Sequence, residues 1–452
     1  MRRWFTAPGF WFAILVAFLG VKQLLALFVF RQPGNAFLPD SFGYEDLAVN
    51  LLQCASFDVP GEPMVGLVRT PGYPVFIAGI YALAGRIPGW VIFVQLILDA
   101  LTALLIWRIG RQYFSETAGV IGALIYAISL NATVGALYLL SDTLFTFLLV
   151  GALFLLSQYW RAPAQRWLIS LGVILGLLPL VRPIGLYLAL IWIAFFAIKQ
   201  WKDSIKRWYR QPLVVGLLCA VLVAPWILRN YAATGRAMFS AAEAMNLYCC
   251  FAPAALAEDE KIPLLDARAQ VDAPFRFQSL NTVEPRQLFL AADYAIQIIL
   301  QHPLGYAKAH FKGVLATLFE PAYKQWLQLL GSEYTASGFL AKLMTLDLKG
   351  AIASLSETTA AGWFWLALPI LNLSYTIAEY GLAVWGAWKI SRQSLNSQVL
   401  ALALLCAITI FYLVVAPGSG GGLRFRIPAE PLFALLAAVG LARTNFQMTR
   451  NS

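Results

Sequence analysis

The sequence predicts an all-α protein that crosses a membrane many times. Of its 452 residues, 60% are hydrophobic and 12% are charged, and the mean hydropathy is +0.70, whereas soluble domains carry about 25% charged residues. Many apolar runs reach or approach the roughly 20 residues that cross a ~30 Å hydrocarbon core. These runs do not alternate as the strands of a membrane barrel do, so we expect helices and exclude a water-soluble fold.

The apolar runs define about ten transmembrane helices in a single integral membrane domain covering residues 1–452. Because ten is an even number, both termini lie on the same side of the membrane. The spans are expected near residues 10–30, 89–107, 117–136, 139–158, 167–181, 184–198, 212–228, 363–388, 398–415 and 428–443.

The basic residues indicate how these spans are oriented. Lys and Arg gather in the segments on the side of the two termini, and the positive-inside rule makes that side cytoplasmic. The residues concerned are Arg108, Arg111, Arg161, Arg166, Lys199, Lys202, Lys206, Arg207, Arg210, Lys389, Arg392, Arg443 and Arg450.

Two large segments are left on the outer face, a first loop at 31–88 and a long loop at 230–362. The apolar stretch 73–85 has 13 residues, which is short for a span, and a span there would move the next basic turn to the outside. We therefore expect it to be a helix at the membrane interface. The stretch 303–319 is also expected to be interfacial.

Charge and cysteine usage exclude other classes of partner. The net charge is +10, but the basic residues lie between apolar runs and form no concentrated stripe for nucleic acid. The five cysteines (Cys54, Cys219, Cys249, Cys250 and Cys406) and the two histidines lack the spacing of a zinc site. No cofactor is indicated, and nothing in these patterns supports a divalent metal ion.

Seven ionisable residues converge on the outer face in this topology. Such residues near membrane depth are costly and are therefore functional candidates. Local alternatives stay open, since Asp40 and Asp142 are also suited to capping helices, and arginines beside prolines also reach toward lipid headgroups. The candidates are Asp40, Arg69, Asp142, Arg182, Arg229, Arg424 and Arg426.

A series of motifs in a fixed order resembles a known family. The chain is similar to bacterial glycosyltransferases of the GT-C superfamily, of the family 39 type, a group that includes lipid A aminoarabinose transferases and protein O-mannosyltransferases. The resemblance spans almost the entire chain. The motifs are PDSFGYEDLAVNLL at 39–52, RTPGYPVFIAG at 69–79, LLSDTLFTFLL at 139–149, GLLPLVRPIGL at 176–186, APWILRNYAATG at 224–235, HPLGYAKAHFKGVLATLFEP at 302–321 and RFRIPAEP at 424–431.

The resemblance implies a GT-C-like bundle with interfacial helices in the first outer loop and a cavity that opens to the periplasm. It implies that Asp40 is the catalytic base, with Asp142 as the second candidate. Arg69, Arg182 and Arg424 or Arg426 would face the lipid phosphate, and we also assign Tyr44, Tyr73 and Arg229 to substrate binding. At Ser41, where many relatives carry a second acid, the match departs, so a metal-bound version of this motif is in doubt.

The implied reaction agrees with this set of residues. A polyprenyl-phosphate-linked sugar already carries an anionic leaving group, so its departure needs cations, and arginine forks suit that role. The acceptor, which is a glycan, lipid or protein, needs a carboxylate to take its proton. We therefore expect an inverting glycosyltransferase of the bacterial inner membrane with a periplasmic active site, in contact with donor, acceptor and membrane lipids.

Two alternatives have different signatures. A transporter or flippase of lipid-linked glycans has a similar number of spans, but its repeated halves and paired broken helices are not evident in the sequence. A glycan polymerase or ligase shares arginine-rich outer loops but lacks an early acid followed by RTPGYP. The site residues therefore have to separate these functions.

Overall fold

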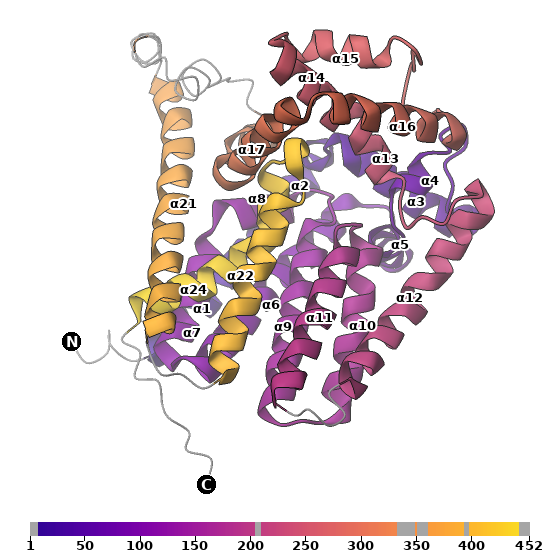
Figure 1. Ribbon diagram of the computed structural model, residues 1–452. Helices are drawn as coiled ribbons and strands as arrows, with labels where there is room; N and C mark the ends of the chain where they lie inside the picture. Colours follow the sequence, from indigo (N-terminus) through magenta and orange to yellow (C-terminus); the bar gives the residue numbers. More distant parts are fainter. Residues whose placement is uncertain (1–7, 204–208, 332–348, 350–359, 393–396, 443–452) are drawn as a thin grey trace.

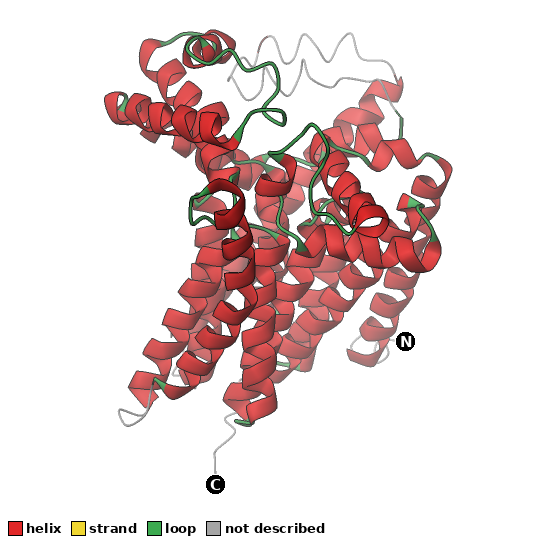
Figure 2. Ribbon diagram, turned by 90° about the vertical axis from the view of Figure 1, so that its right-hand side faces the viewer, coloured by secondary structure: helices red, strands yellow, loops and turns green. Residues whose placement is uncertain are grey.

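The structure is a computed structural model that describes residues 8–203, 209–331, 349, 360–392 and 397–442. Within these residues the regular elements are all helices, and no strand is found among them (Figures 1 and 2). This confirms the predicted all-α polytopic fold class. The basic residues Lys206, Arg207, Arg443 and Arg450 lie outside the described residues.

Five helical segments are long and apolar enough to cross a membrane, judged by length and composition among the described residues. The first joins α1 (Pro8–Lys22), η1 (Gln23–Leu25) and α2 (Ala26–Arg31). The others are α6 (Pro88–Tyr113), α9 (Asp142–Arg161), α12 (Arg210–Thr234) and α22 (Ser397–Val415). Three further helices belong to the bundle: α10 (Gln165–Val181), α11 (Gly185–Asp203) and α21 (Ala360–Arg392).

The expected span 117–136 is broken. Its two halves, α7 (Glu116–Ile128) and α8 (Leu130–Leu137), are bent by 56°. Ser129 stands at the break, where its hydroxyl accepts a hydrogen bond from the Ala132 N–H and donates to Glu430 Oε2 at 3.0 Å. A carboxylate from the end of the chain therefore stabilises the start of α8.

The expected span 428–443 also differs from the structure. Its helix, α24 (Glu430–Leu441), has 12 residues and is about 18 Å long at 1.5 Å per residue, too short for the hydrocarbon core by itself. It continues without a break from α23 (Leu423–Arg426) and η5 (Ile427–Ala429). The motif RFRIPAEP at 424–431, expected in an outer turn, thus lies at the start of this helical segment.

Helices from the two outer segments cover one end of the bundle. Figure 1 shows the α14–α17 layer across this end, and the turned view in Figure 2 agrees. The elements of this layer and its surroundings are α3 (Pro39–Cys54), α4 (Val65–Val68), α5 (Gly72–Ala84), α13 (Ala242–Asn246), η3 (Leu247–Phe251), α14 (Ala252–Glu260), α15 (Leu264–Asp272), α16 (Pro285–Gln301), α17 (Pro303–Phe319) and α18 (Tyr323–Leu329). The stretches 73–85 and 303–319, predicted as short helices, correspond to α5 and α17.

Two of the basic residues expected on the cytoplasmic side, Arg111 and Arg161, lie at the opposite end of the bundle. The Tyr113 hydroxyl, at the end of α6, donates to the Ser157 carbonyl near the end of α9. The Gln398 amide, at the start of α22, donates to the Trp160 carbonyl in that same turn of α9. Arg111 and Arg161 occupy the last turns of α6 and α9, so they lie at this end, away from the α14–α17 layer.

A buried ion pair ties three helices together inside the bundle. Lys22 Nζ lies 2.7 Å from Asp99 Oδ2, and the Tyr126 hydroxyl donates to Asp99 Oδ1 at 2.8 Å. The Lys22 and Asp99 side chains are 3% and 1% exposed. Because both charges are paired and hydrogen-bonded, the burial that would otherwise be costly is tolerated, and α1, α6 and α7 are fixed relative to one another.

Candidate active site

Arg69 and Arg182 are each followed closely by a proline. Arg69 lies two residues before Pro71, and Arg182 lies directly before Pro183. Both arginines have extended backbones, with ψ of 141° for Arg69 and 132° for Arg182. A residue before proline avoids the helical region, which explains why α10 ends before Arg182. Gly72 allows the two turns to meet, since a Cβ there would lie 2.7 Å from the Leu180 carbonyl oxygen.

Asp40 and Asp142 both stand in the first turn of a helix, yet neither caps it with its side chain. At the start of α3 the hydroxyl of Ser41 accepts a hydrogen bond from the Leu38 N–H at 3.0 Å. At the start of α9 no side-chain cap is present. The carboxylates of Asp40 and Asp142 point instead toward arginines, so capping does not account for them.

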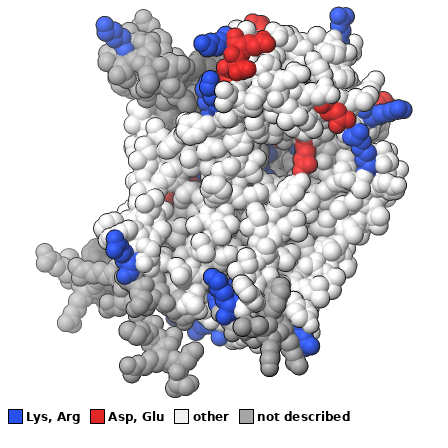
Figure 3. Space-filling view, viewed as in Figure 1, with Lys and Arg blue, Asp and Glu red and all other residues white. Residues whose placement is uncertain are grey.

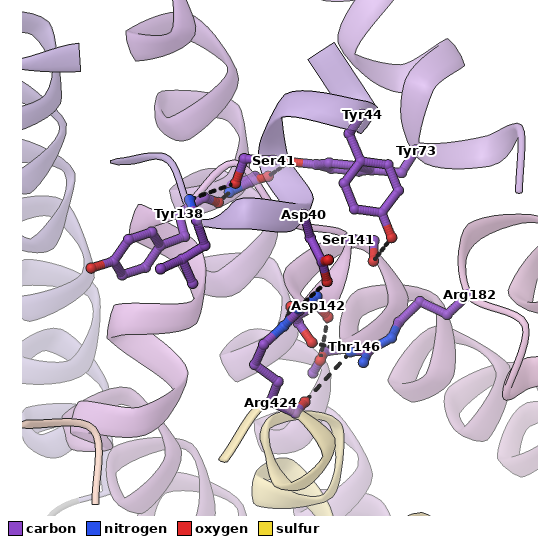
Figure 4. A network of polar contacts seen from close by, with 12 residues as sticks. Asp40, Ser41, Tyr44, Tyr73, Tyr138, Ser141, Asp142, Thr146, Arg182 and Arg424 are labelled. Carbon is purple, nitrogen blue, oxygen red and sulfur yellow. Dashed lines mark hydrogen bonds and ion pairs between the residues drawn. The ribbon is translucent and has the colours of Figure 1, made fainter. Parts of the chain in front are cut away.

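The two acids and three arginines form a row of alternating charge. Figure 4 shows its members Asp40, Arg424, Asp142 and Arg182. Arg69 Nη2 lies 2.7 Å from Asp40 Oδ1, and Arg424 Nη1 pairs with Asp40 Oδ2. Arg424 Nε lies 3.3 Å from Asp142 Oδ2, and Arg182 Nη1 pairs with Asp142 Oδ1. The order is therefore Arg69, Asp40, Arg424, Asp142, Arg182, with a net charge of +1. The carboxylate oxygens of both acids are all paired with guanidinium groups.

Exposure changes along this row. The side chains of Asp142 and Arg182 are 0% and 8% exposed, whereas those of Arg69, Arg424 and Asp40 are 22%, 28% and 34% exposed. In the face seen in Figure 3, Lys or Arg atoms are visible inside a recess below the layer of outer helices. The Asp40 half of the row is therefore open to a ligand, and the Asp142 half is closed.

The arginines keep Asp40 ionised. Burial acts to raise the pKa of Asp40, but the charges and hydrogen bonds of Arg69 and Arg424 outweigh it and hold that pKa well below its usual range. The pKa of Arg424 is raised, because Asp142 and Asp40 together outweigh the effect of burial. Asp40 and Arg424 are thus both charged at neutral pH.

Aromatic rings line the Arg69 side of the row. The Arg69 guanidinium lies over the Tyr44 ring at 4.8 Å, which is a cation–π contact. The Tyr44 hydroxyl is 3.3 Å from Ser141 Oγ. Tyr73 packs edge-on behind Tyr44 and donates to Gln95 Oε1. Of the two predicted tyrosines, Tyr44 therefore contacts a site residue directly, and Tyr73 supports it from a fully buried position.

Two predicted arginines lie outside the row. Arg229 donates to the carbonyls of Phe57 and Gly66 and pairs with Asp58 Oδ1 at 2.7 Å, so it holds the first outer segment against α12. Arg426 is 0% exposed, pairs with Glu430 and donates to two carbonyls at the end of α17. The structure thus brings Arg69, Arg182 and Arg424 together, and Arg229 and Arg426 belong to other networks.

The sequence did not single out three residues that shape the site. Ser141 contacts Tyr44, Phe425 lies under Arg182 with 5.4 Å between the guanidinium carbon and the ring centre, and Glu320 Oε2 accepts from the Leu423 N–H at 3.0 Å. Ser141 precedes Asp142 and Phe425 lies between Arg424 and Arg426, so their position beside predicted site residues could have indicated them. Glu320 directly follows α17 and lies in the 302–321 motif, but nothing in that motif indicates a contact with Leu423, more than 100 residues later.

The site offers little to a metal ion. Among the residues that the structure describes, no group of three or more His, Cys, Asp and Glu side chains is arranged to hold one. A divalent ion at Asp40 or Asp142 would have to displace arginines from both acids. The residues present therefore do not fit a metal, and no step of the chemistry below uses one.

Comparison with known proteins gives two findings. The profile of the family described as dolichyl-phosphate-mannose-protein mannosyltransferase matches residues 68–228, a segment that contains Arg69, Asp142 and Arg182. The archaeal oligosaccharyltransferase AglB from Archaeoglobus fulgidus, solved with an inhibitory peptide and a dolichol-phosphate, is 14% identical, with a TM-score of 0.50. That match covers 94% of this chain and 50% of AglB.

The chain has the GT-C fold. This confirms the GT-C-like helical bundle that the resemblance implied. The GT-C-like chain spans about half the length of AglB. It also matches ArnT from Cupriavidus metallidurans in the apo state, with 13% identity, a TM-score of 0.43, and coverage of 96% of this chain and 77% of ArnT. No curated protein sequence matches the chain.

Proposed function

We propose that the chain is a membrane glycosyltransferase that moves a sugar from a polyprenyl-phosphate-linked donor to an acceptor on the periplasmic face. The observation that carries this proposal is a partly open carboxylate, Asp40, paired with Arg69 and Arg424 at one end of a membrane bundle. The same group of residues supplies a base and a set of cations for an anionic leaving group.

The arginines suit an anionic ligand such as a phosphate ester. Guanidinium groups bind phosphate oxygens through paired N–H donors, and they are concentrated here on the open side of the row. The solved AglB complex contains a dolichol-phosphate, which supports a lipid-linked phosphate as the ligand. Arg69 and Arg424 would contact that phosphate, and Arg182 would contribute its charge from behind.

The transfer step needs one base and no acid. The acceptor oxygen or nitrogen attacks the anomeric carbon while the Asp40 carboxylate takes its proton. The bond from the anomeric carbon to the phosphate oxygen breaks, and its electron pair stays on the departing polyprenyl phosphate, which gains one negative charge held by the arginines. Attack from the side opposite the phosphate inverts the anomeric centre. The protonated Asp40 then returns its proton to water.

The charge distribution supports a periplasmic site. Arg111 and Arg161 lie at the end of the bundle opposite the Asp40 row, and cytoplasmic ends carry the excess of basic residues. In a background without the native cysteines, a cysteine at position 58 should react with a membrane-impermeant thiol reagent added outside. A cysteine at position 163, in the turn between α9 and α10, should not. The reverse pattern in intact cells would place the site in the cytoplasm.

A transporter or flippase is less well supported. The broken helix α7–α8 is the one bent pair found among the described residues, and its break binds Glu430 and lies apart from the Asp40 row. Transporters instead place paired broken helices at the substrate site.

Vesicles that contain the purified protein test the function directly. A panel of polyprenyl-phosphate monosaccharides is added with bacterial membrane extract as the source of acceptor. We expect release of polyprenyl phosphate from at least one donor, together with appearance of the sugar on the extract. Movement of an intact lipid-linked sugar across the bilayer, with no release from any donor, would favour the flippase instead.

A further inference from the structure

In this structure the acid and the arginines of the proposed site are paired with one another. Both Asp40 oxygens are occupied by guanidinium groups, and Arg69 and Arg424 each spend a donor on Asp40. A carboxylate paired in this way is a poor base, because its anionic form is stabilised. Each guanidinium group keeps further N–H donors, but its positive charge is already paired with the Asp40 carboxylate. A donor that enters this site therefore has to compete with Asp40.

Arg424 binds the two acids through different nitrogen atoms, so it can release Asp40 and still keep Asp142. Arg424 pairs with Asp142 through Nε and with Asp40 through Nη1. Arg182 Nη1 pairs with Asp142 and lies 3.4 Å from the Arg424 carbonyl oxygen, to which it donates. A ligand can thus replace Asp40 at Nη1 while Asp142 and Arg182 keep the Arg424 side chain in place.

Exposure indicates which of the two acids gives way. The Asp142 side chain is fully buried, so losing its arginines would leave an unpaired charge without water. The Asp40 side chain is 34% exposed, so water can solvate it when its arginines turn to another anion. The exchange is therefore inexpensive at Asp40 and costly at Asp142.

We propose that Asp40 is masked by Arg69 and Arg424 until the phosphate ester of the donor displaces it, and that Asp142 is a positioning residue that holds Arg424 during the exchange. This inference rests on the function proposed above. The donor then binds before the acceptor is activated, because Asp40 becomes free to take a proton once the phosphate has taken its arginines. The donor phosphate replaces the Asp40 carboxylate beside Arg69 and Arg424, so these two arginines have an anionic partner throughout.

The mask has a consequence that an ordinary contact residue lacks. Removing the Asp40 charge should improve phosphate binding while it abolishes the base. We expect full-length Asp40→Asn protein in nanodiscs to bind a polyprenyl phosphate about two- to thirtyfold more tightly than wild type, which corresponds to two partly exposed ion pairs. Asp142→Asn should weaken that binding by about two- to thirtyfold through misplacement of Arg424, and Asp142→Glu should restore part of it.

Two variants serve as matched controls. Asp58→Asn removes a carboxylate that pairs with Arg229 outside the row, and Asp46→Asn removes a charge from the same helix as Asp40. Both should leave the affinity for polyprenyl phosphate within about twofold of wild type, because neither acid competes for Arg69 or Arg424. Thermal unfolding of each variant shows whether a change in affinity reflects damage to the fold.

The outcomes separate the inference from the function it rests on. Unchanged or weaker binding by folded Asp40→Asn protein overturns the mask, although wild type still binds polyprenyl phosphate. Absence of binding to wild type overturns the proposed function itself. Inorganic phosphate and phosphatidylglycerol are measured alongside. The same ranking of variants with inorganic phosphate supports recognition of the phosphate group, and a ranking seen only with phosphatidylglycerol overturns the assignment to the donor.

Discussion

Arg424 and Arg426 stand two residues apart in the same short helix, yet they belong to two different kinds of network. Arg426 and Glu430 are 0% and 1% exposed, and their partners are protein groups in α17, α8 and η5–α24. Arg424 and Asp40 are 28% and 34% exposed and share one ion pair at an open surface. The comparison teaches that pairing alone does not mark a site. The buried network of Arg426 and Glu430, here called the closed network, stabilises the fold. The partly exposed network of Arg424 and Asp40, here called the open network, can exchange a protein anion for a ligand.

Breaking the closed network should have the largest effect on stability. Arg426→Met leaves Glu430 buried with no cation and removes the donors to the end of α17, which costs about 3–5 kcal/mol. We expect a marked fall in the yield and in the thermal unfolding temperature of detergent-solubilised protein. The double variant Arg426→Met with Glu430→Gln should recover part of this loss. Wild-type stability in the single variant would show that the network is dispensable.

Removing a cation from the open network should affect ligand binding more than folding. Arg69→Ala loses a fork that faces the proposed phosphate, so the affinity for polyprenyl phosphate should fall by about ten- to a hundredfold, the weight of one or two charge-assisted hydrogen bonds. Arg69→Lys should recover only part, since a point charge cannot replace the fork. Equal affinities in folded wild type and Arg69→Ala would remove Arg69 from the phosphate site.

Of Arg426, Arg69 and Arg229, we expect the smallest effect from replacing Arg229. Its donors reach Phe57, Gly66 and Asp58 and do not reach the row. Arg229→Ala should therefore loosen the first outer segment and change the affinity for polyprenyl phosphate by less than about threefold, as expected for a partly exposed pair. Limited proteolysis near position 58 should become faster. A loss of affinity as large as that of Arg69→Ala would place Arg229 in the phosphate site after all.

Much of the open network could be predicted from local sequence. Arg182 stands directly before a proline that restricts its backbone, and Arg69 stands two residues before Pro71. The apolar stretches 73–85 and 303–319 gave the bounds of α5 and α17 to within one residue. The division between Arg424 and Arg426 could not be predicted, because residues two apart on a helix point about 200° apart and only tertiary packing decides which of them faces Asp40. The break at Ser129 depends on Glu430, 301 residues away. From the sequence alone a capping role for Asp40 stayed open, but the side chain that bonds the start of α3 is that of Ser41.

The central claim is that Asp40 is the base of a transfer reaction, and Asp40→Asn tests it most directly. Asparagine keeps the size of the side chain and most of its hydrogen bonding but removes its basicity. We predict that transfer from a polyprenyl-phosphate sugar falls by about 10²–10⁴-fold, the usual weight of general-base catalysis, with binding of polyprenyl phosphate retained or improved. Near-normal transfer by folded Asp40→Asn protein would contradict the account and remove Asp40 from the mechanism.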